Sequence, residues 1–246
     1  KTDHIGQLTK TVKAAAQAFF EDSFRRWLVG MVACAIDDEA QNHQLMLLHG
    51  AQGKGKSTFV RHLLPPELKD YYRNGMISPD NKDHLLQMSS CLLINLDEFD
   101  KYAPTKMPLL KNLMQMASLS LCKAYQKNYR SLPRIASFIG TSNRKDLLTD
   151  PTGSRRFICV LVEYPIDCEG IDYAQLYAQL KAEILTGEHY WFTKEEETEL
   201  QQSNMTFYRQ GPVEDVLRSC YRAAEKGEGC ELLSSADIFQ RLKKIN

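Results

Sequence analysis

The sequence has no pair of cysteines at Cys-x-x-Cys spacing, although it contains seven cysteines. An odd number without metal-ligand spacing argues against a disulfide framework and a zinc ribbon, and it favours a reducing compartment. The chain also lacks the run of about 18 apolar residues that a membrane-spanning helix requires. Its first ten residues are polar and contain no apolar segment of a signal peptide. We therefore expect a cytoplasmic protein with no membrane partner.

The chain has no net charge, because 31 lysines and arginines balance 31 aspartates and glutamates among its 246 residues. Hydrophobic residues make up 43% and charged residues 25%, which is typical of a folded globular protein. The charges are unevenly distributed. Residues 123–156 hold eight basic and two acidic side chains, whereas residues 163–199 hold ten acidic side chains and two lysines. Local patches govern nucleic-acid binding, so the zero total does not exclude such a partner. The same separation would let the basic face of one subunit meet the acidic face of the next.

Short apolar runs alternate with helical patterns along most of the chain. Four runs have the length of buried strands: 45–48, 92–96, 135–139 and 157–162. Helical patterns cover 13–20, 24–35, 58–64 and 107–121, and capping residues begin two more helices at Asp172 and Thr193. Residues 67–81 show no clear pattern. This alternation predicts an α/β fold with a mostly parallel central sheet flanked by helices.

Three parts of the chain differ in character. We expect an N-terminal helical segment at 1–43 that packs on the core, and a core with its following helices at 44–210. A small helical tail at 211–246 follows Gly211-Pro212. The tail has helical stretches at 213–226 and 234–244 and resembles a truncated winged-helix unit.

The segment from Gly50 to Ser57 matches the pattern Gly-x-x-x-x-Gly-Lys-Ser at every fixed position. It follows a strand-like run and precedes a helical one, which is the context of a P-loop. Glycines allow the backbone N–H groups to turn inward and surround phosphate oxygens. The pattern predicts ATP as ligand, with Lys56 on the β- and γ-phosphates and Ser57 on Mg²⁺. The expected nucleotide-binding residues are Gly50, Gln52, Gly53, Lys54, Gly55, Lys56, Ser57 and Thr58.

Two later strands also end in polar residues. Asp97 and Glu98 follow the apolar run 92–96, and this arrangement is typical of a Walker B element. Asp97 would hold Mg²⁺, and Glu98 would activate the attacking water, because a P-loop supplies no base of its own. Asn143 closes the next strand, in the run Gly-Thr-Ser-Asn, and an asparagine or threonine there would contact the γ-phosphate or the water; a turn asparagine is the alternative.

Basic residues lie on both sides of the third strand. Arg155 and Arg156 precede the fourth strand, and either can serve as an arginine finger toward a neighbouring subunit. Between 123 and 130, lysines and tyrosines alternate, a pattern that suits phosphate contacts together with base stacking. The candidate nucleic-acid residues there are Lys123, Lys127, Tyr129 and Arg130. The alternative for the two arginines is a surface ion pair, and the alternative for residues 123–130 is a solvated hairpin.

Taken in order, these motifs resemble the virulence-associated protein E family of primase-helicase ATPases from phages and mobile elements, which is related to superfamily 3 helicases. The resemblance extends from about Phe24 to about Phe207. It implies an AAA+-like P-loop core, Mg-ATP hydrolysis and assembly of a homo-oligomeric ring on single-stranded DNA, with a hexamer among the sizes considered. It also implies a primase domain or partner. Members often carry Arg-x-Pro-Tyr before the third strand, where this chain has residues 123–130 instead.

The motifs and the resemblance together predict an ATP-driven, helicase-like motor domain acting on DNA. Two other functions remain open at this point. A P-loop kinase of a small molecule would share the loop but would not need the Asp97-Glu98 pair. A nucleotide-binding module that recruits a partner through its tail would not hydrolyse ATP.

Overall fold

The structure, a computed structural model, describes residues 2–78, 80–122, 129–148, 153–208, 216–217, 219–222, 224 and 228–243. The chain divides into two compact units, Lys1–Tyr208 and Arg209–Asn246. Each unit is described by itself below.

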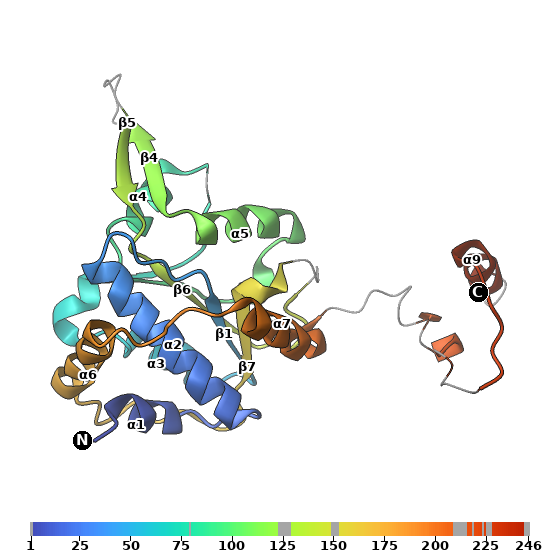
Figure 1. The fold of residues 1–246 in the computed structure, drawn as a ribbon, viewed down its shortest axis with the longest axis horizontal. Helices are drawn as coiled ribbons and strands as arrows, with labels where there is room; N and C mark the ends of the chain where they lie inside the picture. The colour runs from blue at the N-terminus through green and yellow to red at the C-terminus, as the bar shows by residue number, and fades with distance from the viewer. Residues whose placement is uncertain are drawn as a thin grey trace. The chain divides into compact units, whose positions relative to one another are not determined.

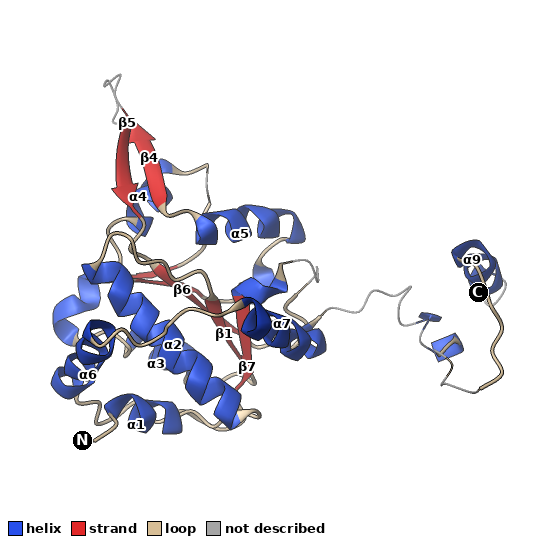
Figure 2. Ribbon diagram, in the orientation of Figure 1, coloured by secondary structure: helices blue, strands red, loops and turns tan. Residues whose placement is uncertain are grey.

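Within the described part of the first unit, five strands form one sheet in the order β2-β3-β6-β1-β7, and every neighbouring pair is parallel. The α/β fold and the parallel sheet predicted from the sequence are therefore confirmed. Figure 2 shows the strands between layers of helices. The strands are β1 (Leu45–His49), β2 (Tyr72–Asn74), β3 (Leu93–Leu96), β6 (Ser137–Ser142) and β7 (Phe157–Leu161).

Helices cover both faces of the sheet, and alternate strand residues face opposite layers. Met46 and Leu48 belong to the cluster on one face, whereas Leu45 and Leu47 belong to the cluster on the other. Burial on both sides explains why these strands are continuous apolar runs in the sequence. The helices of the first face are α1 (His4–Lys10), α2 (Gln17–Ile36), α3 (Lys56–Arg61) and α6 (Tyr173–Leu185); those of the second are α4 (Lys82–Met88) and α5 (Met107–Gln115).

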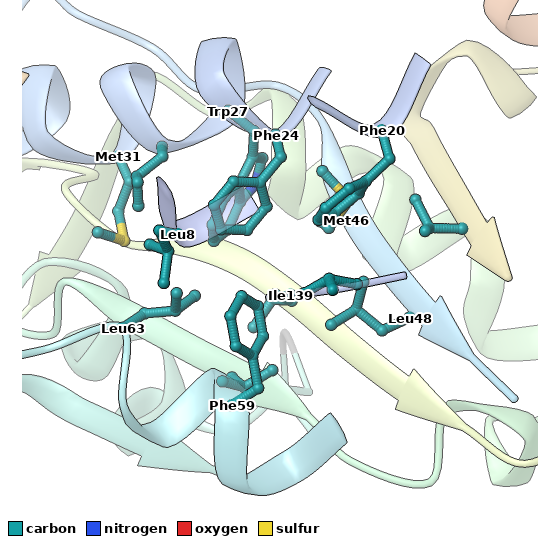
Figure 3. Packing of buried hydrophobic residues seen from close by; sticks show 14 of the residues in the cluster. Leu8, Phe20, Phe24, Trp27, Met31, Met46, Leu48, Phe59, Leu63 and Ile139 are labelled. Carbon is teal, nitrogen blue, oxygen red and sulfur yellow. The ribbon is translucent and has the colours of Figure 1, made fainter. Parts of the chain in front are cut away.

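The largest buried side chains lie where α2 crosses the sheet, as Figure 3 shows for Phe20, Phe24 and Trp27. The Trp27 indole N–H donates to the carbonyl oxygen of Phe138 at 3.2 Å, which fixes α2 against β6. At the other end of the unit, α7 (Lys194–Ser203) contacts β7. Short 3₁₀ turns connect the larger elements: η1 (Pro66–Tyr71), η2 (Phe99–Lys101), η3 (Pro104–Lys106), η4 (Ser154–Arg156) and η5 (Asn204–Phe207).

Two predicted helix boundaries are wrong. The Ala-rich run from residue 13 does not begin a helix, because Ala14 pairs with Val162 in a β-bridge and α2 starts only at Gln17. The pattern at 107–121 is helical only as far as Gln115. The residues that follow form an antiparallel hairpin of β4 (Ser118–Cys122) and β5 (Tyr129–Pro133), whose pairing overrides the local helical pattern. The hairpin projects beyond α4 and α5 (Figure 1).

The helix caps read from the sequence are confirmed. The Asp172 side chain accepts a hydrogen bond from the backbone of Gln175 at the start of α6. Thr193 and Glu196 form a reciprocal capping box at the start of α7. Both caps satisfy backbone N–H groups that the first helical turn leaves without partners.

In the second unit, the main described element is α9 (Ser235–Lys243), which corresponds to the predicted helix at 234–244. Its N-terminus is capped by Ser234, whose hydroxyl accepts from the Asp237 backbone at 3.2 Å. Much of the predicted helix at 213–226 lies outside the described residues. Neither unit contains, among the residues described, a helix long and apolar enough to cross a bilayer.

Candidate functional site

The carboxyl ends of three strands meet at one edge of the sheet because the strands are parallel and in register. His49 of β1 pairs with Ser142 of β6, and Leu96 of β3 pairs with Gly140 of β6. The segments that follow these strands are therefore neighbours. They enclose a cavity of about 280 Å³, lined by Gln52, Gly53, Lys54, Gly55, Lys56, Ser57, Thr58, Asp97, Glu98, Thr141, Ser142 and Asn143.

The glycine-rich loop between β1 and α3 depends on glycine for both conformation and space. Gly53 and Gly55 have φ of 84° and 78°, in the left-handed region that other residues rarely adopt. Gly50 has φ of 151°, and a Cβ atom there would lie 2.5 Å from the carbonyl oxygen of Val162. A loop of this shape directs backbone N–H groups inward and suits an anion.

Lys56 is buried inside this loop, with 6% of its surface exposed. Its Nζ atom donates to the carbonyl oxygens of Gly50 at 2.7 Å and Ala51 at 3.0 Å, and to Oδ1 of Asn143 at 3.1 Å. Burial and the nearby charge of Lys54 lower the pKa of Lys56. The ammonium group thus connects the loop to the end of β6.

Asp97 accepts hydrogen bonds from two hydroxyl groups on two other elements. Ser57 Oγ donates to Asp97 Oδ1 at 3.0 Å, and Thr141 Oγ1 donates to the same oxygen. Burial alone would raise the pKa of Asp97, but the hydrogen bonds from Thr141 and Ser57 outweigh it and the pKa is lowered. An ionised carboxylate next to a hydroxyl provides the oxygen ligands that Mg²⁺ prefers.

Glu98 is the one non-glycine residue with positive φ in the described part of the chain, at φ 53° and ψ 46°. Such a backbone costs about 1–3 kcal/mol and persists where the surrounding structure requires it. The carboxylate is exposed and accepts from Lys101 Nζ at 2.6 Å. The turn after β3 thus holds Glu98 at the mouth of the cavity.

The structure brings together most of the residues predicted for this site. The five main residues line one cavity: Lys56 and Ser57 begin α3, Asp97 and Glu98 follow β3, and Asn143 follows β6. Gly50 lies behind it and contributes its carbonyl oxygen to Lys56. The candidate residues chosen from the sequence did not include Thr141 and Ser142, although both stand in the Gly-Thr-Ser-Asn run that ends in Asn143. Ser142 Oγ donates to Oδ1 of Asp100 at 2.6 Å and ties β6 to the turn after β3.

Arg155 and Arg156 do not reach this cavity within one chain. They lie in η4, immediately before β7, and Phe157 at the start of β7 pairs with Leu45 at the start of β1. The arginines therefore lie at the amino edge of the sheet, opposite the glycine-rich loop. Arg155 pairs with Glu197 of α7 at 3.1 Å. Burial, and then the charge of Arg155, lower the pKa of Arg156.

The predicted nucleic-acid residues belong to the hairpin. Lys123 and Lys127 lie outside the described residues, and for Tyr129 and Arg130 the structure describes only the backbone, as part of β5. Arg134, which the sequence placed in the same basic segment, is only 2% exposed. It donates to backbone carbonyl oxygens and therefore adds nothing to an exposed basic surface.

A larger cavity of about 750 Å³ lies among α1, α2 and α6. Its charged side chains are bonded to one another: Arg25 pairs with Asp3 at 3.1 Å and with Glu183 at 2.6 Å. These groups stabilise the packing of three helices. The smaller cavity at the sheet edge is thus the better candidate for a functional site.

The fold and this cavity define a class: an α/β protein with a parallel sheet whose glycine-rich loop and acidic strand ends share one edge. The chain belongs to the virulence-associated protein E-like domain family, whose model matches residues 1–209. This membership confirms the resemblance found in the sequence. A second family model, described as a domain of unknown function from B. Theta, matches residues 210–246.

Comparison with solved structures gives matches to the NrS-1 C terminal region. Its A form apo structure (305–718) is 16% identical, with a TM-score of 0.42, and the match covers 84% of this chain and 43% of that one. A further apo structure of the region is 13% identical, with a TM-score of 0.46, and the match covers 90% and 52%. The chain thus spans about half the length of these structures. No curated protein matches it.

Proposed function

We propose that this chain is a Mg²⁺-dependent ATPase with an AAA+-like P-loop core. The observation that carries the proposal is the convergence of Lys56, Ser57 and Asp97 with Glu98 in one cavity. A buried lysine in a glycine-rich loop, a hydroxyl beside an ionised carboxylate, and a second, exposed carboxylate are the parts that phosphoanhydride hydrolysis needs. Membership of the virulence-associated protein E-like family agrees with a role in replication of a phage or mobile element.

Each residue has a role that follows from its position. Lys56 would exchange the carbonyl oxygens of Gly50 and Ala51 for phosphate oxygens of ATP. Ser57 and Asp97 would hold Mg²⁺, which when bound neutralises charge on the β- and γ-phosphates. Glu98 would accept a proton from the attacking water. Asn143, already bonded to Lys56, would orient the γ-phosphate or that water.

We further propose that the chain acts on DNA as a ring of identical subunits, in the manner of a helicase. The position of Arg155 and Arg156 supports a ring, because they lie at the sheet edge opposite their own cavity and could reach only a neighbour's nucleotide. The basic and aromatic residues of this segment support DNA contact, because Lys123 and Lys127 fall between β4 and β5 in the sequence and Tyr129 and Arg130 begin β5. Single-stranded DNA fits this combination of cations and aromatic rings.

Phosphate release from ATP, measured with and without single-stranded DNA, tests the proposal. We expect hydrolysis that needs Mg²⁺, needs no acceptor molecule and increases with DNA. Glu98→Gln should bind ATP but not hydrolyse it, whereas the control Glu67→Gln, on the exposed turn η1, should behave as the wild type. If no phosphate is released at any salt or protein concentration, the ATPase proposal is wrong. Release only with an added acceptor would indicate a kinase.

Mixing two inactive variants tests the ring. Glu98→Gln retains its arginines, and the double variant Arg155→Ala/Arg156→Ala retains its cavity. In a mixed ring, some interfaces place the arginines of one variant beside the intact cavity of the other. The mixture should therefore hydrolyse ATP although neither variant does so alone. A mixture that remains inactive while both variants still assemble would contradict a shared site.

A further inference from the structure

The segment from Val162 to Ile166, which we call the strap, runs directly against the glycine-rich loop. Lys54 Nζ donates to the carbonyl oxygens of Val162, at 3.2 Å, and of Glu163. The Ile166 N–H donates to the Lys54 carbonyl oxygen at 3.0 Å. The strap and the loop therefore share one set of hydrogen bonds, although about 110 residues separate them in the sequence.

The strap is also held from its other side. The Glu163 N–H donates to the carbonyl oxygen of Lys13 at 2.8 Å, and Ala14 pairs with Val162. Ile166 is buried in the core of this face. Both ends of the strap are thus fixed to buried parts of the fold, and the residues between them have a defined position beside the loop.

Tyr164 lies at the centre of this fixed segment and is 62% exposed. Pro165 follows it and disfavours a helical backbone at Tyr164. Within the described part of the chain, no hydrogen bond or ring contact of the Tyr164 side chain is found. A large aromatic ring is therefore presented to solvent on a rigid segment next to the loop.

The cavity itself offers groups for phosphates and a metal ion but no aromatic surface for a nucleobase. Its lining consists of glycines and of polar and charged side chains from Gln52 to Thr58, together with Asp97, Glu98 and residues 141–143. A nucleotide held there by its phosphates must place its base just outside. The strap is hydrogen-bonded to the loop that lines this cavity, and it carries the exposed Tyr164 ring.

We propose that Tyr164 is the platform on which the base of the bound nucleotide stacks. The inference rests on the proposed nucleotide-binding function and adds a base subsite to it. Stacking on an aromatic ring uses the π-face that every base has, so the platform contributes affinity for a nucleoside triphosphate. It contributes nothing to the binding of a phosphate chain that has no base.

The test compares the affinities of ATP and inorganic tripolyphosphate, each with Mg²⁺, for the full chain and three variants. Tyr164→Ala should weaken ATP binding roughly 5- to 100-fold and leave tripolyphosphate unchanged. Tyr164→Phe keeps the ring and should retain most of the ATP affinity. The matched control Tyr71→Ala removes another exposed tyrosine, on η1, and should change neither ligand. In hydrolysis, Tyr164→Ala should raise KM while kcat stays within about two-fold, because the ring contacts the base and not the reacting atoms.

Two results would overturn the platform while leaving the ATPase proposal intact. One is wild-type affinity for ATP in Tyr164→Ala, and the other is an equal loss for ATP and tripolyphosphate, which would indicate a distorted loop. If the wild-type chain binds neither ligand, the proposed function fails and the base subsite fails with it.

Discussion

At the scale of single residues, the hydrogen bonds to Asp97 are the most informative feature of the site. One carboxylate oxygen accepts from Ser57 and from Thr141, and the two hydroxyl oxygens lie 3.4 Å apart. Thr141, on β6, thus bonds the same carboxylate oxygen beside the Ser57 hydroxyl. In the proposed function Asp97 holds Mg²⁺ and Thr141 orients it, and loss of such a neighbouring group typically costs about 10- to 100-fold in metal affinity.

Replacing Thr141 with valine should weaken Mg²⁺ binding roughly ten-fold, because valine keeps the shape and removes the hydroxyl that orients Asp97. Thr141→Ser restores the hydroxyl and should restore the affinity. The measurement is the Mg²⁺ concentration that gives half-maximal ATP hydrolysis. An unchanged half-maximal concentration in Thr141→Val would show that Thr141 does not position the carboxylate.

His49, the last residue of β1, is 2% exposed and its ring lies edge-on to Phe207 at 4.8 Å between centroids. Burial, followed by the charges of Lys145 and Lys56, lowers its pKa from 6.5 to about 4. The unfolded chain therefore binds a proton more readily than the folded one between these two values. Protonation of His49 destabilises the fold as the pH falls through this interval.

We expect the free energy of unfolding to fall by up to about 3 kcal/mol between pH 6.5 and pH 4 through His49 alone. Urea unfolding of the wild type and of His49→Asn at pH 7.5 and pH 4.5 measures this contribution, because all other titrating groups are common to both. The difference between the two pH values should be smaller in the variant. Equal pH dependence would mean that His49 is not the group responsible.

At the scale of secondary structure, the sequence predicted the strands whose residues are buried on both faces. The runs at 45–48 and 92–96 correspond to β1 and β3, because strands covered on both sides are apolar throughout. The edge strand β2 was not predicted, since Tyr72, Arg73 and Asn74 are few and partly exposed. The local pattern predicts helix across most of the hairpin strand β4, whose stability comes from pairing with β5 rather than from local preference.

The same distinction applies to the site. The glycine-rich loop, Asp97 and Asn143 could be located because each belongs to a short motif with its own chemistry. Thr141 stands in the last of these motifs but does not match a fixed role, so only its contact with Asp97 identifies it. The contact of Lys54 with the strap joins distant segments, and no local pattern indicates it.

Arg134 joins the base of the hairpin to the sheet. Its guanidinium donates to the carbonyl oxygens of Met116 at 2.7 Å, Ala136 at 2.6 Å and Asn42 at 3.2 Å. These three residues precede β4, β6 and β1, so one side chain fixes the starts of three strands. Burial lowers the pKa of Arg134.

Arg134→Met keeps much of the side-chain volume but leaves three carbonyl oxygens, two of them in buried hydrogen bonds, without these donors. We expect a loss of roughly 3 kcal/mol in the free energy of unfolding, measured by urea denaturation. Arg144→Met is the matched control, because Arg144 is exposed and pairs with Asp146, and it should cost less than about 1 kcal/mol. Similar losses in the two variants would contradict the special role of Arg134.

At the scale of the whole molecule, the distribution of charge differs from its appearance in the sequence. Among the described residues of the first unit, three of the ten acidic residues in 163–199 form ion pairs: Glu183 with Arg25, Glu196 with Arg26, and Glu197 with Arg155. Among the basic residues of 123–156, Arg134 is buried. The charge available for contacts between subunits is therefore smaller on both sides than residue counts indicate.

The boundary of the first unit predicts which truncation the chain tolerates. A chain ending at Tyr208 retains the whole first unit and should melt within a few degrees of the full chain. A chain ending at Ser203 loses Phe207 from the core, and it loses Asn204, whose side chain donates to the carbonyl oxygens of Ser154 and Phe157 at 2.9 and 2.7 Å. The melting temperature of this shorter chain should be clearly lower than that of the chain ending at Tyr208. Thermal unfolding followed by circular dichroism measures both, and equal melting temperatures for the two truncations would contradict this boundary.

The order of strands in the sheet has a consequence for how the chain is made. The central strand β1 pairs on one side with β6 and on the other with β7, and about 110 residues separate Leu45 from its partner Phe157. At a synthesis rate of about 5–20 residues per second, β1 leaves the ribosome roughly 5–20 seconds before its second neighbour exists. Both edges of this apolar strand are unpaired until β6 is made, and one edge stays unpaired until β7 is made, so the strand is prone to aggregation during that interval. We therefore expect nascent chains of this protein to be bound by chaperones that recognise exposed apolar segments until β7 emerges.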